Sequence, residues 1–198
     1  KEAQDYEFRA VCIPPFWVKK ASRDLGKNSN ISLVTVIGFP LGYQMTETKM
    51  EEAKLAIRDG ATELDLVWNI SAFKAEMIWP KIEVVKLSKL CHDSDVILKV
   101  IIETAYLSKD EIIRACKICS DAGADFIKTS SGFANRGASL EDVELIKANI
   151  PSTVRIKASA GIKTYKQVVD LVNAGAERIG TSSAVSIVEE FKTIGKGN

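Results

Sequence analysis

The sequence predicts an α/β protein in which parallel strands form a (β/α) barrel, and three observations support this prediction. Short runs of β-branched residues alternate with amphipathic helical segments along the chain. A helix–Gly–Ala–strand unit recurs, and several strands carry polar residues at mid-strand on one face only. Because strand–helix alternation implies a parallel sheet with right-handed crossovers, we expect a single domain over residues 1–198.

Seven strands are expected from the β-branched runs. In chain order they are Phe8–Ile13, Ser32–Phe39, Glu63–Asn69, Val96–Glu103, Asp125–Ser130, Arg155–Ser159 and Arg178–Ser182. A barrel of the TIM type has eight strands. The first residues, KEAQDYEF, are typical of the last turns of a helix that enters the first of these strands. We therefore expect a TIM barrel that lacks its first strand and most of its first helix, and so is N-terminally incomplete.

The helices between these strands carry start and stop signals. Ser108-x-x-Glu111 and Thr164-x-x-Gln167 are capping boxes, whose side chains satisfy free N–H groups of a first turn. Three helices are expected to end at a glycine in the left-handed conformation, directly before a strand. These endings are Gly60-Ala61, Gly123-Ala124 and Gly175-Ala176.

An open, doubly wound sheet is the alternative to a barrel for an alternating chain. No G-x-G-x-x-G follows the first strand, and the pattern within the strands favours the barrel. In Glu63–Asn69, Leu64, Leu66 and Trp68 share one face while Asp65 lies on the other. In a barrel the apolar face contacts the helices and the polar positions line the interior.

Composition excludes several classes of function. The chain has 27 Lys and Arg against 26 Asp and Glu, so its net charge of +1 gives no field that attracts nucleic acid or an anionic membrane. No apolar run is long enough to span a bilayer and the N-terminus is no signal peptide, so a cytoplasmic location is expected. Cys116-x-x-Cys119 is interpreted as buried core, and His92 as a loop residue.

Lys99, Lys128 and Lys157 stand in the middle of three successive strands, each 29 residues from the last. Lysine is rarely buried unless it is paired or functional. Amine attack on a carbonyl needs the free base, whereas an isolated lysine has a pKa of about 10.4. Neighbouring ammoniums and a desolvated pocket lower that pKa. Asp65 faces the same interior and is a candidate for proton transfer, or for a salt bridge to these lysines.

A second group of candidates follows the last two strands. Gly161 and Lys163 come after Arg155–Ser159, and Gly180-Thr181-Ser182-Ser183 closes the last strand and opens a helix. In TIM barrels the loops after strands seven and eight commonly bind phosphate through backbone N–H groups and a helix N-terminus. The sequence therefore predicts an amine nucleophile acting on a phosphorylated carbonyl compound, without a metal or other cofactor.

These residues lie within stretches that resemble the deoxyribose-phosphate aldolase family over almost the whole chain. The stretches include Gly38-Phe39-Pro40-Leu41-Gly42, Glu63-Leu64-Asp65-Leu66-Val67, Leu98-Lys99-Val100-Ile101-Ile102-Glu103-Thr104, Phe126-Ile127-Lys128-Thr129-Ser130-Ser131-Gly132-Phe133, Ile156-Lys157-Ala158-Ser159 and Ile179-Gly180-Thr181-Ser182-Ser183. The resemblance implies a class I aldolase that reversibly cleaves 2-deoxy-D-ribose 5-phosphate to D-glyceraldehyde 3-phosphate and acetaldehyde, in deoxyribonucleotide catabolism. It also implies that the enzyme uses no metal.

The resemblance assigns roles to particular residues. Lys128 would form the Schiff base, and Lys157 and Asp65 would transfer protons. The phosphate would contact Gly132, Gly161, Lys163, Gly180, Ser182 and Ser183. Between Lys128 and Lys157 the choice of nucleophile rests on the resemblance, because periodicity treats the two alike.

Three positions depart from the family pattern. The usual opening strand with Asp-His-Thr is absent, and Phe133 stands where some members place a phosphate-binding lysine. Ala160 replaces the first of two consecutive glycines, which would strain the backbone by about 1–2 kcal/mol if φ is positive there.

Other readings stay open at this stage. They are a Schiff-base aldolase for another sugar phosphate, and an inactive truncated barrel or a phosphate-binding barrel that survives by association. Because an incomplete barrel leaves two strand edges unpaired, we expect a homo-oligomer. Its other partners would be a small sugar phosphate and an aldehyde, with no nucleic acid and no membrane.

Overall fold

A computed structural model of the chain describes residues 1–26 and 29–194. Seven parallel strands form one sheet in which each strand pairs with its neighbours in sequence, in the order β1 to β7. They are β1 (Ala10–Ile13), β2 (Ser32–Ile37), β3 (Glu63–Val67), β4 (Ile97–Ile101), β5 (Phe126–Lys128), β6 (Arg155–Ser159) and β7 (Arg178–Gly180). The predicted barrel-type sheet with seven strands is confirmed.

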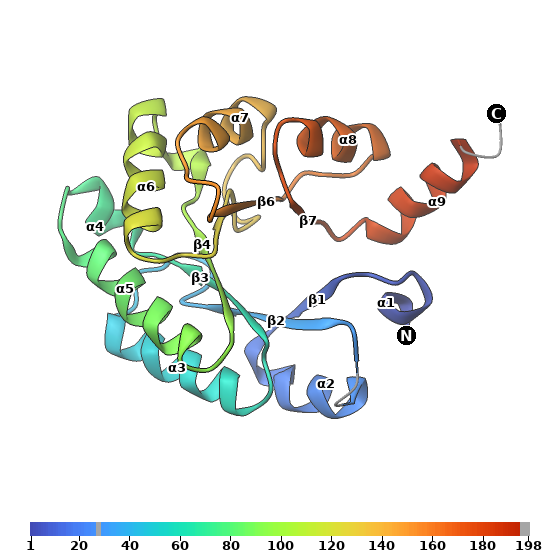
Figure 1. The fold of residues 1–198 in the computed structure, drawn as a ribbon, viewed down its shortest axis with the longest axis horizontal. Helices are drawn as coiled ribbons and strands as arrows, with labels where there is room; N and C mark the ends of the chain where they lie inside the picture. The colour runs from blue at the N-terminus through green and yellow to red at the C-terminus, as the bar shows by residue number, and fades with distance from the viewer. Residues whose placement is uncertain (27–28, 195–198) are drawn as a thin grey trace.

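Helices connect the strands and cover the outside of the sheet, as Figure 1 shows. They are α1 (Glu2–Asp5), α2 (Val18–Leu25), α3 (Thr46–Arg58), α4 (Ile70–Lys74), α5 (Trp79–His92), α6 (Lys109–Asp121), α7 (Leu140–Ala148), α8 (Tyr165–Asn173) and α9 (Ala184–Ile194). Two short 3-10 helices, η1 (Pro15–Trp17) and η2 (Thr104–Tyr106), follow β1 and β4.

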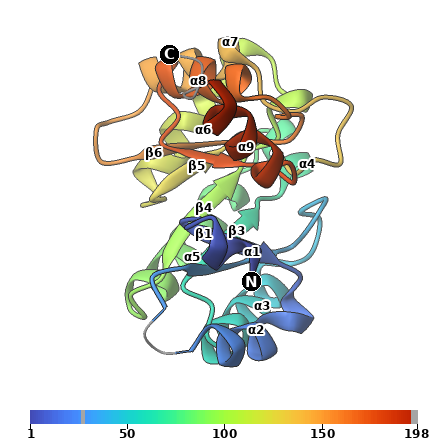
Figure 2. The ribbon, with the colours of Figure 1, turned by 90° about the vertical axis from the view of Figure 1, so that its right-hand side faces the viewer.

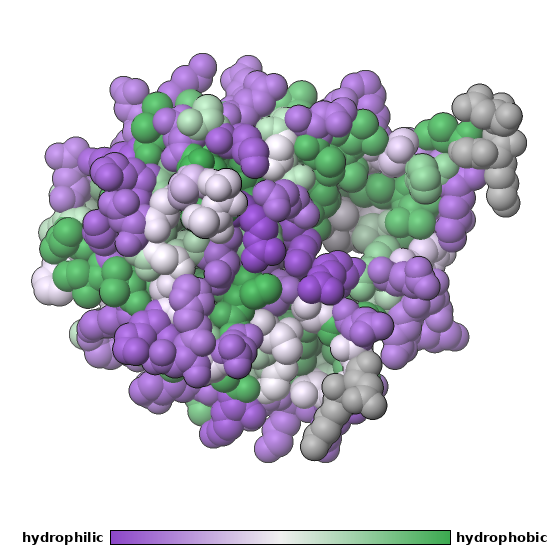
Figure 3. Space-filling view, viewed as in Figure 1, coloured by the Kyte–Doolittle hydropathy of each residue, from purple (hydrophilic) through white to green (hydrophobic). Residues whose placement is uncertain are grey.

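The curled sheet is open between its first and last strands. Within the described residues, β1 pairs only with β2 and β7 only with β6. In Figure 2, α1 and β1 lie on one side of this opening, and α8 and α9 on the other. The space-filling view shows a notch at the same place, on the right-hand side of Figure 3. A cavity of about 470 Å³ opens there, lined by residues of α1, β1, β7 and α9.

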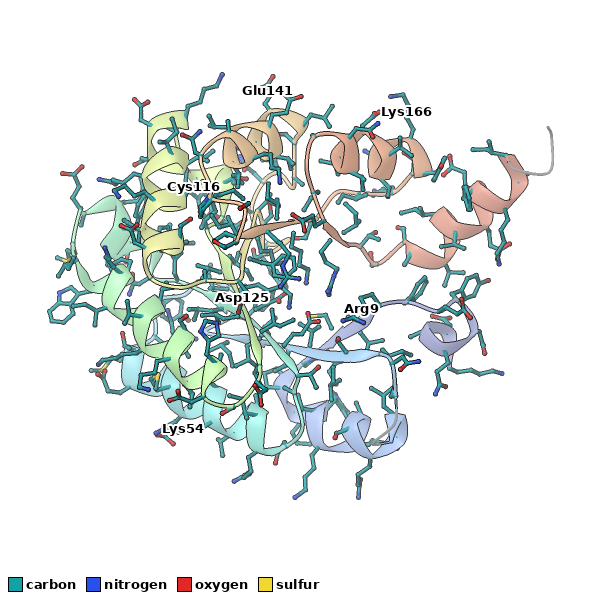
Figure 4. All side chains as sticks on the ribbon, viewed as in Figure 1. Arg9, Lys54, Cys116, Asp125, Glu141 and Lys166 are labelled. Atoms are coloured by element: carbon teal, nitrogen blue, oxygen red, sulfur yellow. The ribbon has the colours of Figure 1, made fainter. Side chains whose placement is uncertain are left out.

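The hydrophobic core lies between the sheet and the helices, as the pattern in β3 predicted. Leu64, Leu66 and Trp68 are completely buried in this core, while the alternate residue Asp65 points to the other face of the sheet, towards the charged side chains of the barrel interior. Cys116 and Cys119 of α6 are buried in the same core as free thiols, in agreement with their interpretation. Figure 4 places Cys116 on the inner side of its helix, whereas Lys54 and Lys166 point outward.

The helix signals are confirmed at both ends. Ser108 and Thr164 each accept a hydrogen bond from the backbone N–H three residues later, and both reciprocal capping boxes form. The three predicted terminating glycines have φ values of 107°, 83° and 114°, which is the left-handed region. Among the helices of the described residues, none is long and apolar enough to cross a membrane.

Two groups of local predictions need correction. Several strands are shorter than predicted: β5 covers Phe126–Lys128 instead of Asp125–Ser130, and β7 ends at Gly180 instead of Ser182. Asn69, predicted as the end of a strand, caps α4 through its side chain. His92 is the last residue of α5 and not a loop residue, and its Nε2 lies 3.2 Å from Oδ2 of Asp125.

Candidate active site

Three lysines from adjacent strands converge on one carboxylate inside the barrel. The Nζ atoms of Lys128 and Lys157 lie 2.8 and 2.7 Å from Oδ2 of Asp65, and Nζ of Lys99 lies 2.9 Å from Oδ1. The side chains of Lys128 and Lys157 are each 7% exposed, whereas those of Lys99 and Asp65 are fully buried. Parallel register explains the convergence, because Asp65 pairs with Lys99 across β3–β4 and Lys128 pairs with Lys157 across β5–β6.

This arrangement shifts the acidity of its members. Burial lowers the pKa of Lys157, and the neighbouring Lys128 and Lys99 ammoniums lower it further, against the attraction of Asp65. Burial alone would raise the pKa of Asp65, but the three ammoniums hold that pKa well below its usual range. At neutral pH Asp65 is therefore a carboxylate, and Lys157 gives up its proton more readily than an ordinary lysine.

A second charged layer lies below this cluster and fixes its position. Glu63 forms ion pairs with Lys99 at 2.7 Å and with Arg178 of β7 at 3.1 Å. The Arg178 guanidinium lies over the ring of Phe126, 5.7 Å from its centroid. Lys99 thus bridges Glu63 and Asp65. Its ammonium forms ion pairs with both carboxylates and is buried in the interior. Lys128 and Lys157 instead reach towards the end of the barrel at which the strands have their carboxyl ends.

That open end holds a cavity of about 380 Å³. Lys128 and Lys157 line it, and so do all six residues predicted to contact phosphate: Gly132, Gly161, Lys163, Gly180, Ser182 and Ser183. Gly180 is the last residue of β7 and the others lie in the loops after β5, β6 and β7, whose carboxyl ends meet at this edge of the sheet. The structure therefore brings together every residue predicted for the site: eight of them line the cavity, and Asp65 lies beneath, in contact with the two lysines.

The cavity offers positive groups and free amide donors. Within the described residues, the Lys163 ammonium forms no ion pair, and the backbone amides of Gly132, Gly161 and Ser182 donate no hydrogen bond. Two other amides are already used: that of Lys163 donates to Gln167 and that of Ser183 to the Thr181 hydroxyl. Free amides beside a cation are the groups that bind a phosphate.

Two of the positions that depart from the family pattern, Ala160 and Phe133, lie in these loops. Ala160 has a φ of 71°, so the condition stated for backbone strain at this alanine is met. Phe133 is 69% exposed and packs edge-on against Phe39 of the β2–α3 loop, with ring centroids 5.3 Å apart. Without a lysine at that position, the cationic side chain among the predicted phosphate contacts is Lys163.

Several residues of the site were not predicted from the sequence. Cys12, Ser131 and Thr181 also line the cavity, and Thr181 donates to the carbonyl of Ile162, which ties the loops after β6 and β7 together. Glu103 lies behind the cavity and accepts hydrogen bonds from Ser131. Their positions at the carboxyl ends of strands are the one sequence signal that marks them.

Comparison with known proteins agrees with the aldolase family that the sequence resembles. A sequence profile described as DeoC/LacD family aldolase matches residues 1–188. The chain belongs to this aldolase family. Its relatives include the deoxyribose-phosphate aldolase of Thermococcus kodakarensis, which is 47% identical over 190 residues, covering 95% of this chain and 85% of the relative. That of Brevibacillus brevis is 44% identical over 200 residues, covering 100% of this chain and 88% of the relative.

Solved structures of aldolases have the same fold. The aldolase QR15 superposes with a TM-score of 0.90 at 45% identity, covering 97% of this chain and 85% of that one. The deoxyribose phosphate aldolase from Aeropyrum pernix, described as a unique tetramer, gives 0.90 at 35% identity, with 98% and 81% covered. This chain is thus a DeoC/LacD aldolase, a lyase, with the lysine cluster at the end of the barrel where such enzymes carry their active sites.

Proposed function

We propose that this aldolase reversibly cleaves 2-deoxy-D-ribose 5-phosphate to acetaldehyde and D-glyceraldehyde 3-phosphate through a Schiff base on Lys128. The observation that carries the proposal is one cavity lined by two buried lysines and by a group of phosphate-binding residues. An amine nucleophile and a phosphate site in the same cavity fit a substrate with an aldehyde at one end and a phosphate at the other. The names of the relatives support this substrate.

Lys128 is the proposed nucleophile. Its amine adds to the C1 aldehyde to give a carbinolamine, which loses water to form the imine. The C3 hydroxyl then loses its proton, the C2–C3 bond breaks, and its electron pair moves into the imine to give an enamine. D-Glyceraldehyde 3-phosphate leaves with the phosphate, the enamine takes a proton at C2, and water releases acetaldehyde.

Lys157 and Asp65 are proposed to move the protons. Because the pKa of Lys157 is lowered, its neutral amine can accept the proton that the Lys128 ammonium must lose before it attacks. Asp65 accepts hydrogen bonds from both amines through the same oxygen, and so offers a path between them. Its low pKa makes Asp65 a poor proton acceptor at rest. The carboxylate becomes more basic once the Lys157 ammonium has given its proton to the carbinolamine hydroxyl, which leaves as water, because Lys157 is then neutral.

The phosphate is proposed to bind at the loops after β5, β6 and β7. The free amides of Gly132, Gly161 and Ser182 and the Lys163 ammonium supply the donors. Gly180 and Ser183 line the same wall. Because these groups lie on loops and the lysines on strands, the two ends of the substrate are held by separate parts of the structure.

Trapping with borohydride tests the proposal directly. The protein is incubated with 2-deoxyribose 5-phosphate, reduced, digested and analysed by mass spectrometry. We expect a stable adduct on the peptide that contains Lys128, its loss in Lys128→Met, and no change in Lys54→Met, which removes an exposed lysine of α3. An adduct on Lys157 instead would reverse the two roles, and a folded protein without any adduct would contradict the proposal.

A homo-oligomeric state and a cytoplasmic location belong to the same proposal. The Aeropyrum pernix relative is a tetramer by its description, and β1 and β7 of this chain each have one strand neighbour among the described residues. Light scattering of the purified protein tests the first point, with a monomer at micromolar concentration as the contrary result. The cytoplasmic location follows from the proposed substrate, because an aldolase that acts on a phosphorylated sugar must be in the compartment that holds this sugar.

A further inference from the structure

Glu103 combines burial, charge and an unfavourable backbone conformation directly behind the cavity. It follows β4 with φ 57° and ψ 70°, the left-handed region that a non-glycine residue rarely adopts. It is 2% exposed, and within the described residues no cationic side chain pairs with it. A buried, strained and unpaired carboxylate persists only where the surrounding structure holds it, and such positions cluster at functional sites.

Within the described residues, the hydrogen-bond partners of the Glu103 carboxylate all belong to one residue of the β5–α7 loop. The Ser131 amide donates to both carboxylate oxygens, Oε1 and Oε2, at 3.2 Å each, and the Ser131 hydroxyl donates to Oε2 in a short hydrogen bond. Hydrogen bonds to a charged acceptor are about twice as strong as those between neutral groups. Glu103 therefore fixes both the backbone and the side-chain rotamer of Ser131.

Ser131 passes this constraint along the loop. Its Oγ, held by Glu103, accepts the Phe133 amide at 3.1 Å. The amides on both sides of Gly132 are thus occupied, while the Gly132 amide has no hydrogen-bond partner in the described part of the chain. Gly132 itself has φ 96° and lines the cavity, four residues after Lys128, the last residue of β5.

We propose that Glu103 is a positioning residue for the substrate phosphate: it holds Ser131 and Phe133 so that the Gly132 amide stays free for the phosphate. The inference rests on the proposed function and deepens it. Glu103 is not among the residues that line the cavity, so it acts through Ser131 and not by contact with substrate. The negative carboxylate oxygens of Glu103 accept hydrogen bonds from Ser131 and do not face the proposed phosphate site.

The role predicts a selective kinetic effect of Glu103→Gln. The amide side chain keeps one acceptor but loses the charge, so the hold on Ser131 weakens while the residue keeps its size. We expect the KM for 2-deoxyribose 5-phosphate to rise about tenfold, because the Gly132 amide is no longer held in place for the phosphate, with kcat changed less than about twofold. The KM for unphosphorylated 2-deoxyribose should stay the same.

A matched control is available at Glu76. This residue is also a left-handed glutamate, with φ 57°, but it pairs with Arg114 and its side chain is 78% exposed. Glu76→Gln should change neither KM. Equal rises of KM for both substrates in Glu103→Gln, or a fall in kcat alone, would show that Glu103 supports the fold or the lysines, and would overturn the inference.

Binding of inorganic phosphate separates this inference from the aldolase reaction. Calorimetry should give a dissociation constant about tenfold larger for Glu103→Gln than for the unaltered protein, whether or not any sugar turns over. Hydrogen exchange of the Ser131 and Phe133 amides should become faster in the variant. Equal phosphate affinity in both proteins would refute the role even if the aldolase reaction proceeds.

If Glu103→Gln does not fold, Ser131→Ala tests the same link by changing the partner of Glu103 and leaving Glu103 unaltered. This change removes the hydroxyl that joins Glu103 to the Phe133 amide and leaves the buried carboxylate with the Ser131 amide. The affinity for inorganic phosphate should again fall severalfold. Unchanged affinity in a folded Ser131→Ala protein would contradict the proposed transmission through Ser131.

Discussion

Gly137→Ala is expected to separate the loop after β5 from the loop after β6. An alanine Cβ at this position would lie 2.0 Å from the carbonyl oxygen of Ala160 and 2.4 Å from its carbonyl carbon. Both are backbone atoms, so rotation of a side chain cannot relieve the overlap. The φ of Gly137 lies outside the left-handed region, so the substitution adds steric overlap without backbone strain.

The size of the effect follows from this geometry. The loops must move apart by more than about 1 Å to reach an ordinary contact, and forced overpacking costs about 1–3 kcal/mol. The same movement lengthens the hydrogen bond that the Ala138 amide shares between the carbonyls of Ser159, at 3.1 Å, and Ala160, at 3.2 Å. A lost hydrogen bond adds about 1 kcal/mol. We expect a loss of about 3 kcal/mol of unfolding free energy, which for a chain of this size lowers the melting temperature by about 9 °C.

Thermal unfolding and steady-state kinetics on one set of variants test this expectation. Gly137→Ala should lower the melting temperature and raise the KM for the phosphorylated substrate, because Ala160 and Gly161 belong to the cavity wall. Gly26→Ala is the control: its φ of 75° and ψ of 163° should strain an alanine by about 1–3 kcal/mol, but the added Cβ meets no atom within 4 Å and KM should not change. A Gly137→Ala protein as stable as the unaltered chain would refute the close approach of the two loops.

Three further outcomes are expected. Ala160→Gly should relieve strain and raise the unfolding free energy by about 0.5–1 kcal/mol in urea titrations, net of the freedom that glycine adds to the unfolded chain. Lys99→Met removes an ammonium that lowers the pKa of Lys157, so the rise of kcat/KM with pH should move to higher pH. Lowered folded pKa values of Asp65 and Glu63 mean that the unfolded chain binds more protons in acid, so their contribution to stability should be fully present above about pH 5 and be lost progressively as the pH falls.

The lysine cluster was accessible from the sequence because strand periodicity and parallel register are regular. Lys99, Lys128 and Lys157 recur at one spacing on neighbouring parallel strands. The register places Lys128 beside Lys157 and Lys99 beside Asp65, whereas Lys99 is offset by two residues from Lys128. The left-handed conformation of Ala160 was also predictable, since the family pattern has glycine there. Which of Lys128 and Lys157 is the nucleophile stays a prediction that rests on the resemblance.

Other features depend on contacts that no local pattern contains. The strand at Phe126–Lys128 ends early, and Thr129 and Ser130 beyond it bond through their hydroxyls: Ser130 to Thr129, and Thr129 to the backbone of β6. The link from Glu103 to Ser131 joins residues 28 apart in sequence. Nothing in the sequence around Glu103 marks its left-handed backbone, because glutamate is not a residue that favours it.

The separation of amines on strands from phosphate donors on loops has a consequence for evolution and engineering. The amines of Lys128 and Lys157, which we propose as the reacting groups, belong to strands that are anchored on their outer face by the packed core, so their spacing does not depend on the loops above them. The loops after β5, β6 and β7 are then free to diverge, and a change of the group they recognise leaves the imine chemistry in place. A scaffold of this kind can accept new aldehydes by exchange of three short segments while the catalytic centre is inherited unchanged.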